Sequence, residues 1–257
     1  MAELKGLIFD VDGTLADNEQ DGHRVAFNLA FADAGLDWLW DEQTYDRLLQ
    51  VFGGKERIRY YIDDFLEDFD PPADLDAFIR RIHRRKTERY VELLQTGAIP
   101  LRPGVGRLIG EAHQAGLQLA IASTTTLKNA TTLLEQTLGE QSTGWFDVFA
   151  CGDIVANKKP APDIYEYALE QLGLSAPECL VIEDTELGLA SARAAGLATL
   201  VTVNRTTRNQ DFTGATIVLD SLGEPDAPFT ALAGDAGGAT WVDVAFLRWI
   251  HAQPPPR

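Results

Sequence analysis

The second half of this chain alternates short apolar runs with helical stretches, and that rhythm restricts the fold more than any other feature. Strands are expected at 117–122, 146–151, 179–183 and 197–203, and helices at 105–115, 127–138, 162–172 and 186–195. Strands that alternate with helices form βαβ units, in which the strands pair in parallel. The chain is therefore expected to build an α/β fold around a doubly wound, Rossmann-like parallel sheet.

The first strand of that sheet is expected at 5–11, far along the chain from its partners. Residues 16–98 contain hardly any strand-like run and predict helices at roughly 21–34, 42–50, 55–68 and 74–95. A helical block is thus inserted between the first strand and the rest of its own sheet. We expect a discontinuous core of residues 1–15 and 99–225, an all-helical domain of 16–98, and an extension, 226–257, with a short docking helix.

Net charge limits the partners that this chain can attract. The chain has 257 residues, 45% of them apolar, which is enough for a sizeable core. Its formal net charge of −17 opposes general attraction to nucleic acid or to an anionic membrane, so we expect neither partner. An anionic ligand would need a local group of cations to overcome the field of the protein.

The two cysteines and the N-terminus indicate the compartment. Cys151 and Cys179 lie in or beside apolar runs without metal-ligand spacing, which favours reduced thiols in a reducing compartment. The N-terminus shows no charged leader with an apolar segment, and no apolar run approaches the length of a membrane span. A cytoplasmic monomer is the expectation, with a dimer contact through the C-terminal helix left open.

Polar side chains follow the apolar strands at the points where the strands end. They are Asp10 and Asp12 after the first strand, Ser123, Thr124 and Thr125 after the second, Lys159 in the loop after the third, and Glu183 and Asp184 after the fourth. Ligands of open parallel sheets bind at this edge. Each signal alone has a structural explanation, such as a helix N-cap or a favourable first-turn charge. Their joint occurrence favours one shared site.

These residue types fit phosphoryl transfer. Asp10 could attack phosphorus as a nucleophile, but its charge repels a phosphate dianion and calls for a cation beside it. Mg²⁺ prefers oxygen ligands, which Asp10 and Asp184 would supply with help from Glu183. Lys159 would add a fixed positive charge, and the Ser123 hydroxyl with nearby backbone N–H groups would bind phosphate oxygens.

The second acid, Asp12, suits proton transfer. It could protonate the leaving oxygen and later deprotonate water. Two close carboxylates ionise unequally unless a metal offsets the repulsion, so the acid farther from Mg²⁺ is expected to hold the proton.

Four motifs resemble those of the haloacid dehalogenase-like (HAD) phosphohydrolases. They are Asp10–Thr14, Ser123, Lys159 in Lys-Pro-Ala-Pro-Asp, and Glu183–Asp184, in that order, and the helical insertion resembles the small C1 cap of that superfamily. Within that superfamily, the chain resembles the CbbY group in particular. The segments that carry this resemblance are 15–19, 35–38, 53–58, 82–90 and 158–160. That resemblance implies hydrolysis of xylulose-1,5-bisphosphate, which inhibits Rubisco, to xylulose 5-phosphate.

The resemblance also implies roles for individual residues. Asp10 would be the nucleophile, Asp12 the acid/base with its backbone carbonyl on Mg²⁺, and Asp184 a metal ligand. Ser123 and Lys159 would bind phosphate. One position departs from the pattern, because Asn18 stands where the family usually has Thr; Asn can still form a hydrogen bond there.

A lysine interrupts an apolar stripe of the inserted block. Leu75, Ile79, Ile82, Tyr90 and Leu93 follow helical spacing, and Lys86 falls on the same stripe. Lys86 could be a side chain that reaches solvent at the edge of a helical domain. The functional alternative places it in the cleft between cap and core.

Further polar residues of the block could join that lysine in binding a substrate. Glycines 53–54 allow close backbone approach, and Lys55 and Arg57 follow at once. These cations suit a second phosphate on the substrate, although loop glycines and cations are also common at plain surfaces. Glu19 and His23 could contact sugar hydroxyls, with a solvent-exposed His23 as the alternative.

Three other functions share parts of this pattern. A β-phosphoglucomutase-like mutase has the same motifs and cap but returns the phosphoryl group to sugar. A phosphoglycolate phosphatase-like enzyme would not need the cap cations. A binding protein on the same fold would be expected to lose Asp10 or Asp12, and both are present.

Overall fold

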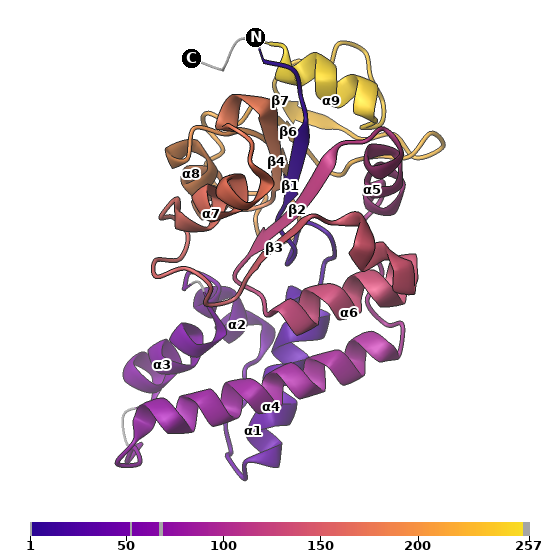
Figure 1. Cartoon of the computed structure of the whole chain (residues 1–257). Helices are drawn as coiled ribbons and strands as arrows, with labels where there is room; N and C mark the ends of the chain where they lie inside the picture. The colour runs from indigo at the N-terminus through magenta and orange to yellow at the C-terminus, as the bar shows by residue number, and fades with distance from the viewer. Residues whose placement is uncertain (1, 52, 67–68, 254–257) are drawn as a thin grey trace. The chain divides into compact units, whose positions relative to one another are not determined.

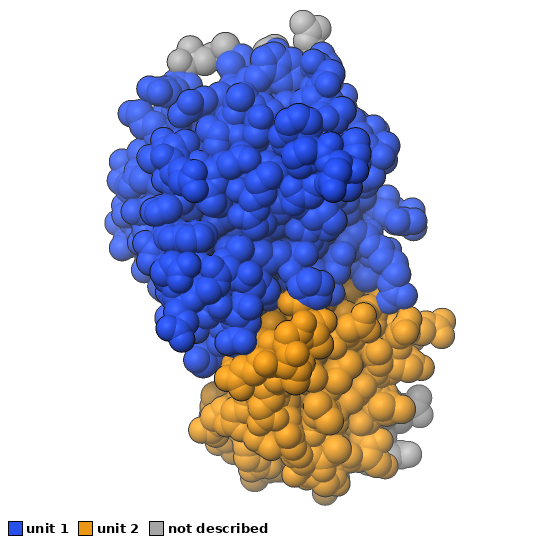
Figure 2. Space-filling model, turned by 90° about the vertical axis from the view of Figure 1, so that its right-hand side faces the viewer, with its two compact units in different colours: residues 1–17, 100–257 blue, residues 18–99 orange. Residues whose placement is uncertain are grey.

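The described residues of the computed structural model, 2–51, 53–66 and 69–253, fall into two compact units. Unit 1 comprises Met1–Asp17 and Pro100–Arg257, and unit 2 comprises Asn18–Ile99 (Figure 2). The C-terminal extension belongs to unit 1. Residues 67–68 of the helix expected at 55–68, and residues 254–257 of the extension, lie outside the described residues.

A seven-stranded sheet forms the centre of the described part of unit 1 (Figure 1). Its order is β3 (Val148–Cys151), β2 (Gln118–Ser123), β1 (Gly6–Phe9), β4 (Cys179–Glu183), β5 (Ala198–Thr202), β6 (Ile217–Leu219) and β7 (Ala231–Ala233). Neighbours from β3 to β6 pair in parallel, whereas β7 is antiparallel to β6. The expected doubly wound α/β fold is confirmed. The short strands β6 and β7 carry too few residues to give a periodic signal and were not predicted.

Strand β1 is an interior strand of the sheet and is buried on both faces. All four of its residues are buried, and Phe9 pairs with Ile121 of β2 and with Ile182 of β4. Near-continuous apolar strands are typical of parallel sheets that carry helices on both sides. Figure 1 shows α7 (Asp163–Leu172) and α8 (Glu186–Ala194) on one face, and α5 (Val105–Gln114) and α6 (Leu127–Leu138) on the other.

Caps set where several helices begin. The Thr126 side chain accepts from the Asn129 N–H at the start of α6, and the Thr185 side chain accepts from the Gly188 N–H at the start of α8. Two short 3₁₀ helices, η2 (Glu140–Trp145) and η3 (Ala176–Glu178), complete the connections. The expected C-terminal helix is α9 (Val244–His251), which packs against α5 with Leu247 fully buried.

Unit 2 is helical throughout its described elements. A π-helix, η1 (Glu19–Arg24), leads into α1 (Val25–Asp33), and α2 (Glu42–Leu48), α3 (Gly54–Phe65) and α4 (Leu75–Gln95) follow. The predicted helix at 21–34 is therefore π-helical at its start. The hydrophobic core of unit 2 is rich in aromatic side chains, which include Phe27, Trp38 and Trp40.

The buried stripe of α4 contains Lys86, as its place on the apolar pattern allowed. Its buried residues are Ile79, Ile82, Lys86, Tyr90 and Leu94. The expectation of Leu93 on this stripe was wrong by one position, because the stripe turns as it advances along a helix of 3.6 residues per turn. No helix in the described ranges combines the length and the apolarity that a bilayer crossing requires.

Candidate active site

The loop after β1 presents the two acids of the first motif. β1 ends at Phe9, and the Asp10 N–H donates to the Ile182 carbonyl at 3.0 Å before the chain turns away. Gly13 permits that turn, with φ at +86°, a region that L side chains rarely adopt. Asp10 is buried and Asp12 is half-buried. Both acids therefore stand just beyond the carboxyl end of β1.

Lys159 reaches this strand end from the loop after β3. Its Nζ donates to Oδ1 of Asp10 at 2.7 Å and to Oε1 of Glu183 at 2.6 Å, and its side chain is fully buried. Burial alone would lower the pKa of Lys159, but attraction to the two carboxylates outweighs burial and raises that pKa well above its usual value. Lys159 therefore provides a permanent positive charge.

Glu183 is engaged at both oxygens. Oε1 accepts from Lys159 and from the Tyr165 hydroxyl, and Oε2 accepts from the N–H groups of Asp184 and Thr185 and from the Thr185 hydroxyl. Burial acts to raise its pKa, yet the charge and hydrogen bonds of Lys159 lower it overall. Glu183 can therefore hold Lys159 in place, in addition to the contact with a metal that is expected from the sequence.

Asp184 is held by one donor on each oxygen. The Thr14 hydroxyl donates to Oδ1 at 3.1 Å, and the Asn204 amide donates to Oδ2 at 2.7 Å. A Cβ at Gly13 would overlap the Asp184 carboxylate, so only glycine lets the first loop approach this closely. The loop after β1 and the loop after β4 are thus in direct contact.

Three buried carboxylates fit a divalent cation. Asp10, Glu183 and Asp184 each offer an oxygen, and these atoms lie within 4.8 Å of one another. Burial, followed by repulsion from the neighbouring acids, raises the pKa of Asp184 well above its usual value. Burial also raises the pKa of Asp10 to about 7, against the opposing charge of Lys159. The three acids thus cannot all ionise with one lysine as their counter-charge, a divalent cation would supply the missing positive charge, and their oxygen donors are those that Mg²⁺ prefers.

Ser123 is the last residue of β2, the strand that pairs with β1. It is buried, and its hydroxyl accepts from the Thr125 N–H at 3.3 Å. Thr124 is half-buried, and Thr126, rather than a residue of the predicted run, caps α6. Ser123 and Thr124 therefore lie between a strand end and a helix N-terminus, where backbone N–H groups favour anions.

Glu19 and Arg57 meet inside unit 2. The Tyr45 hydroxyl donates to Oε2 of Glu19 at 2.5 Å and accepts from Nη1 of Arg57 at 2.8 Å. The two charged groups are themselves 3.5 Å apart. Lys55 lies on α3, where it lines a cavity of about 430 Å³ together with residues of α4. Gly54 brings α3 close to His83 of α4.

Lys86 and His23 form a second polar cluster inside unit 2. Nζ of Lys86 lies 2.7 Å from Nδ1 of His23, and the rings of Phe27 and Tyr90 lie 4.8 Å and 5.2 Å from the ammonium group. His23 stacks on Tyr90, which accepts a hydrogen bond from the Asn18 amide. Both Lys86 and His23 are buried, so the alternatives of a solvent-reaching Lys86 and an exposed His23 are wrong.

Sequence reasoning gave Thr14 no role of its own, although it lies in the first motif, and missed three other residues that contact the unit 1 site. These are Arg102, which donates to the Gly13 carbonyl, Tyr165 and Asn204. Asn204 follows the expected strand 197–203 directly, so the same strand-end rule would have found it. Arg102 stands just after the inserted block and carried no such signal.

Comparison with known proteins places this geometry in a family. A sequence profile of haloacid dehalogenase-like hydrolases matches residues 4–196. Protein CbbY, plasmid, of Cupriavidus necator is 47% identical over 249 residues, which are 96% of this chain and 97% of that protein.

Solved structures agree with the sequence relatives. The crystal structure of CbbY from Rhodobacter sphaeroides in complex with phosphate has a TM-score of 0.79 and 45% identity, and the match covers 85% of this chain and 94% of that one. A mutant of the same protein in complex with xylulose-1,5-bisphosphate matches with a TM-score of 0.79, 44% identity and the same coverage.

Proposed function

The chain belongs to the haloacid dehalogenase-like hydrolases and resembles their CbbY proteins, and from that membership we propose that it is a Mg²⁺-dependent phosphatase of xylulose-1,5-bisphosphate. It acts through a phosphorylated aspartate. The observation that carries the proposal is the buried contact of Lys159 with Asp10 and Glu183, beside Asp184.

Asp10 is the nucleophile of the proposed reaction. An Asp10 oxygen attacks phosphorus, the bond from phosphorus to the sugar oxygen breaks, and Asp12 gives its proton to that oxygen. Asp12 then takes a proton from water, whose oxygen attacks phosphorus and restores the Asp10 carboxylate with release of inorganic phosphate. The half-buried position of Asp12 suits contact with water.

The remaining unit 1 residues bind the phosphate and the cation. Asp10, Asp184 and the Asp12 carbonyl, with Glu183 beside them, would hold Mg²⁺, whose charge would offset that of the phosphate. Lys159 stabilises the negative charge that spreads over the phosphate oxygens, and its double anchoring fixes its position. Ser123 and Thr124 bind the same oxygens from the end of β2.

Residues of unit 2 are proposed to recognise the rest of the substrate. Lys55, Arg57 and Lys86 supply cations for its second phosphate, and Glu19 and His23 bind sugar hydroxyls. The support is the complex of the Rhodobacter sphaeroides relative with xylulose-1,5-bisphosphate. The burial of Lys86 and Arg57 adds to it, because buried cations interact more strongly with an anion than surface ones do.

A substrate panel on the purified protein tests the proposal. Mg²⁺-dependent phosphate release from xylulose-1,5-bisphosphate is expected to exceed release from 2-phosphoglycolate by far, and Asp10→Asn is expected to abolish both. Equal rates on the two substrates would favour the phosphoglycolate phosphatase alternative. Conversion of β-glucose 1-phosphate to glucose 6-phosphate, without phosphate release, would instead establish the mutase.

A further inference from the structure

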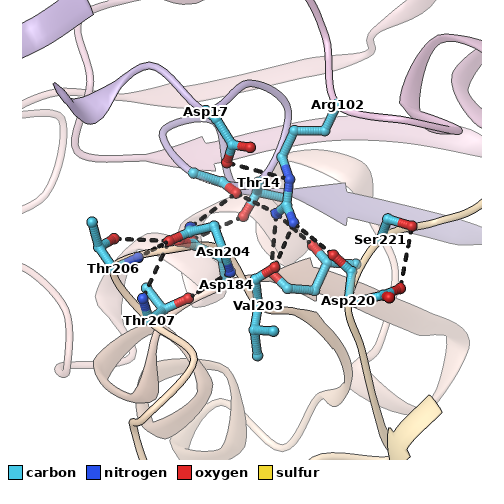
Figure 3. Close-up of polar contacts among 12 residues, drawn as sticks. Thr14, Asp17, Arg102, Asp184, Val203, Asn204, Thr206, Thr207, Asp220 and Ser221 are labelled. Atoms are coloured by element: carbon cyan, nitrogen blue, oxygen red, sulfur yellow. Dashed lines mark hydrogen bonds and ion pairs between the residues drawn. The ribbon is translucent and has the colours of Figure 1, made fainter. Parts of the chain in front are cut away.

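Asn204 links the two loops of the active site. Its Nδ2 donates to Oδ2 of Asp184 at 2.7 Å and to the Gly13 carbonyl at 3.3 Å (Figure 3). Asp184 belongs to the loop after β4, and Gly13 to the loop that carries Asp10 and Asp12. One amide group therefore contacts both elements of the proposed cation site.

The orientation of this amide is fixed by its own turn. Oδ1 of Asn204 accepts from the Thr206 N–H at 2.9 Å, from the Thr206 hydroxyl at 2.8 Å and from the Thr207 N–H at 3.2 Å. Because three donors hold the oxygen on one side, the NH₂ group must face Asp184. This Asx turn begins two residues after the end of β5, so the sheet places the amide close to its edge.

Arg102 holds the same carbonyl from another side. Its Nη1 donates to the Gly13 carbonyl at 2.5 Å and to the Thr202 carbonyl at 3.0 Å, and its Nη2 donates to the Val203 carbonyl at 2.6 Å (Figure 3). Thr202 and Val203 are the two residues before Asn204. Arg102 therefore fixes both the loop after β1 and the strand end from which Asn204 projects.

The peptide before Gly13 is fixed as well. The Gly13 N–H donates to the Ala16 carbonyl at 2.9 Å. Since a peptide group is planar, this bond also sets the direction of the Asp12 carbonyl, which shares the plane. The hydrogen bonds of Gly13 thus control the backbone oxygen assigned to the cation.

We propose that Asn204 is a positioning residue of the cation site, which holds the Asp184 carboxylate at a set separation from the loop of Asp10 and Asp12. The proposal rests on the proposed function for the identity of the cation, but it assigns a role outside the four motifs. Removing a residue that orients a metal ligand typically lowers the affinity for the metal about 10- to 100-fold.

Asn204→Ser tests this role with little disturbance of the turn. A serine oxygen can still accept from the N–H two residues ahead, but it lacks the amide donor to Asp184. Asn209→Ser is the matched control, because it makes the same substitution at an exposed asparagine of the turn that follows Asn204. Mg²⁺ affinity is measured by calorimetry in phosphate-free buffer, and thermal unfolding reports on folding.

Asn204→Ser is expected to weaken Mg²⁺ binding about 10- to 100-fold, with activity restored at high Mg²⁺, while Asn209→Ser stays within about twofold. Affinity within twofold of wild type in a folded Asn204→Ser protein, or equal losses in both variants, would overturn the inference. Should Asn204→Ser not fold, Asn204→Thr, whose hydroxyl can also accept in the turn but which lacks the amide donor, must weaken Mg²⁺ binding in the same way. An inactive wild-type protein that binds Mg²⁺ would refute the proposed function and leave this inference standing.

Discussion

The ammonium group of Lys159 lies 2.7 Å from Oδ1 of Asp10, and both side chains are buried. The same ammonium group contacts Glu183, so it is held between two carboxylates that come from adjacent strands. A lysine held in this way keeps its charge at neutral pH, because attraction to the two carboxylates raises its pKa well above the usual value. It can therefore offset charge on Asp10 and on a phosphate bound there.

Lys159→Met should show how much of the rate depends on that charge. We expect kcat to fall by about 10²- to 10³-fold, the usual loss when one donor to a developing oxyanion is removed. Phosphate release at saturating substrate and Mg²⁺ measures it. Lys158→Met is the matched control, because Lys158 pairs with the exposed Asp153 instead and should leave kcat nearly unchanged. Wild-type turnover in Lys159→Met would remove Lys159 from the reaction.

Mg²⁺ should stabilise the protein more as the pH rises. Burial raises the pKa of Asp10 to about 7, whereas an unfolded aspartate titrates near 3.9. Between these values the folded, metal-free protein binds a proton that the unfolded chain does not, so its stability falls as pH rises through this window. The cation needs the ionised carboxylate and is bound more tightly as that proton leaves.

The increase in Tm caused by Mg²⁺ is therefore expected to be larger at about pH 8 than at about pH 5.5. Differential scanning fluorimetry with and without Mg²⁺ measures both increments. Asp10→Asn removes one of the two cation ligands whose pKa is raised, the other being Asp184, with almost no change in shape, and should reduce the dependence. An increment that shrinks as the pH rises would contradict the assignment of Asp10 to the cation.

The order and type of the main elements of the sheet could be predicted because each strand gave its own periodic signal. The parallel pairing followed from the helices between the strands, and it brought Asp10, Lys159, Glu183 and Asp184 to one edge. Their contacts involve large sequence separations, such as Lys159 to Asp10, that no local pattern encodes. These residues could be expected to be neighbours only because ligands of parallel sheets bind where the strands end.

The supporting residues could not be predicted in the same way. Arg102 acts through carbonyl oxygens of distant residues, and any chain offers such acceptors at every position. The involvement of the Tyr45 hydroxyl between Glu19 and Arg57 likewise depends on helix packing. The place of Lys86 on the apolar stripe indicated its burial, but its contact with His23 had no signal in the sequence.

Lys86→Met should weaken binding of the larger substrate, xylulose-1,5-bisphosphate, selectively. Methionine keeps the apolar stem against Phe27 and Tyr90 but loses the charge. A charged hydrogen bond contributes about 1.5–3 kcal/mol, so KM for xylulose-1,5-bisphosphate should rise about 10- to 100-fold while release from 2-phosphoglycolate changes little. Arg85→Met, next along α4 and paired with Asp33 at the surface, is the control. Equal losses on both substrates would end the assignment of Lys86 to the second phosphate.

Arg102→Lys should lower stability although it keeps the charge. A lysine lacks the planar guanidinium group, so it cannot donate hydrogen bonds to the carbonyls of Gly13, Thr202 and Val203 together. We expect a loss of about 3 kcal/mol, since buried carbonyls would be left unpaired. Thermal unfolding measures it, with the exposed Arg208→Lys as control. Equal unfolding temperatures for the two variants would show that charge alone, and not the planar guanidinium group, matters at this position.

Thr14→Val and Thr199→Val should affect different properties, the first the affinity for Mg²⁺ and the second the stability of the fold. The Thr14 hydroxyl donates to Oδ1 of Asp184, whereas the buried Thr199 hydroxyl has no hydrogen-bond partner within the described part of the chain. Removing the first leaves a buried carboxylate oxygen without its donor, so Mg²⁺ affinity should fall about tenfold. Replacing the second by a methyl group removes an unpaired polar atom, so stability should rise by about 1 kcal/mol without a change in affinity.

Calorimetry for Mg²⁺ and thermal unfolding on both variants separate these effects. Since the two substitutions make the same change in shape at two buried threonines, a general response of the core would move both variants alike. A loss of affinity confined to Thr14→Val would then show that Asp184 must be held at both oxygens to bind the cation. Unchanged affinity in Thr14→Val would instead mean that the Asn204 amide alone is sufficient to orient this carboxylate.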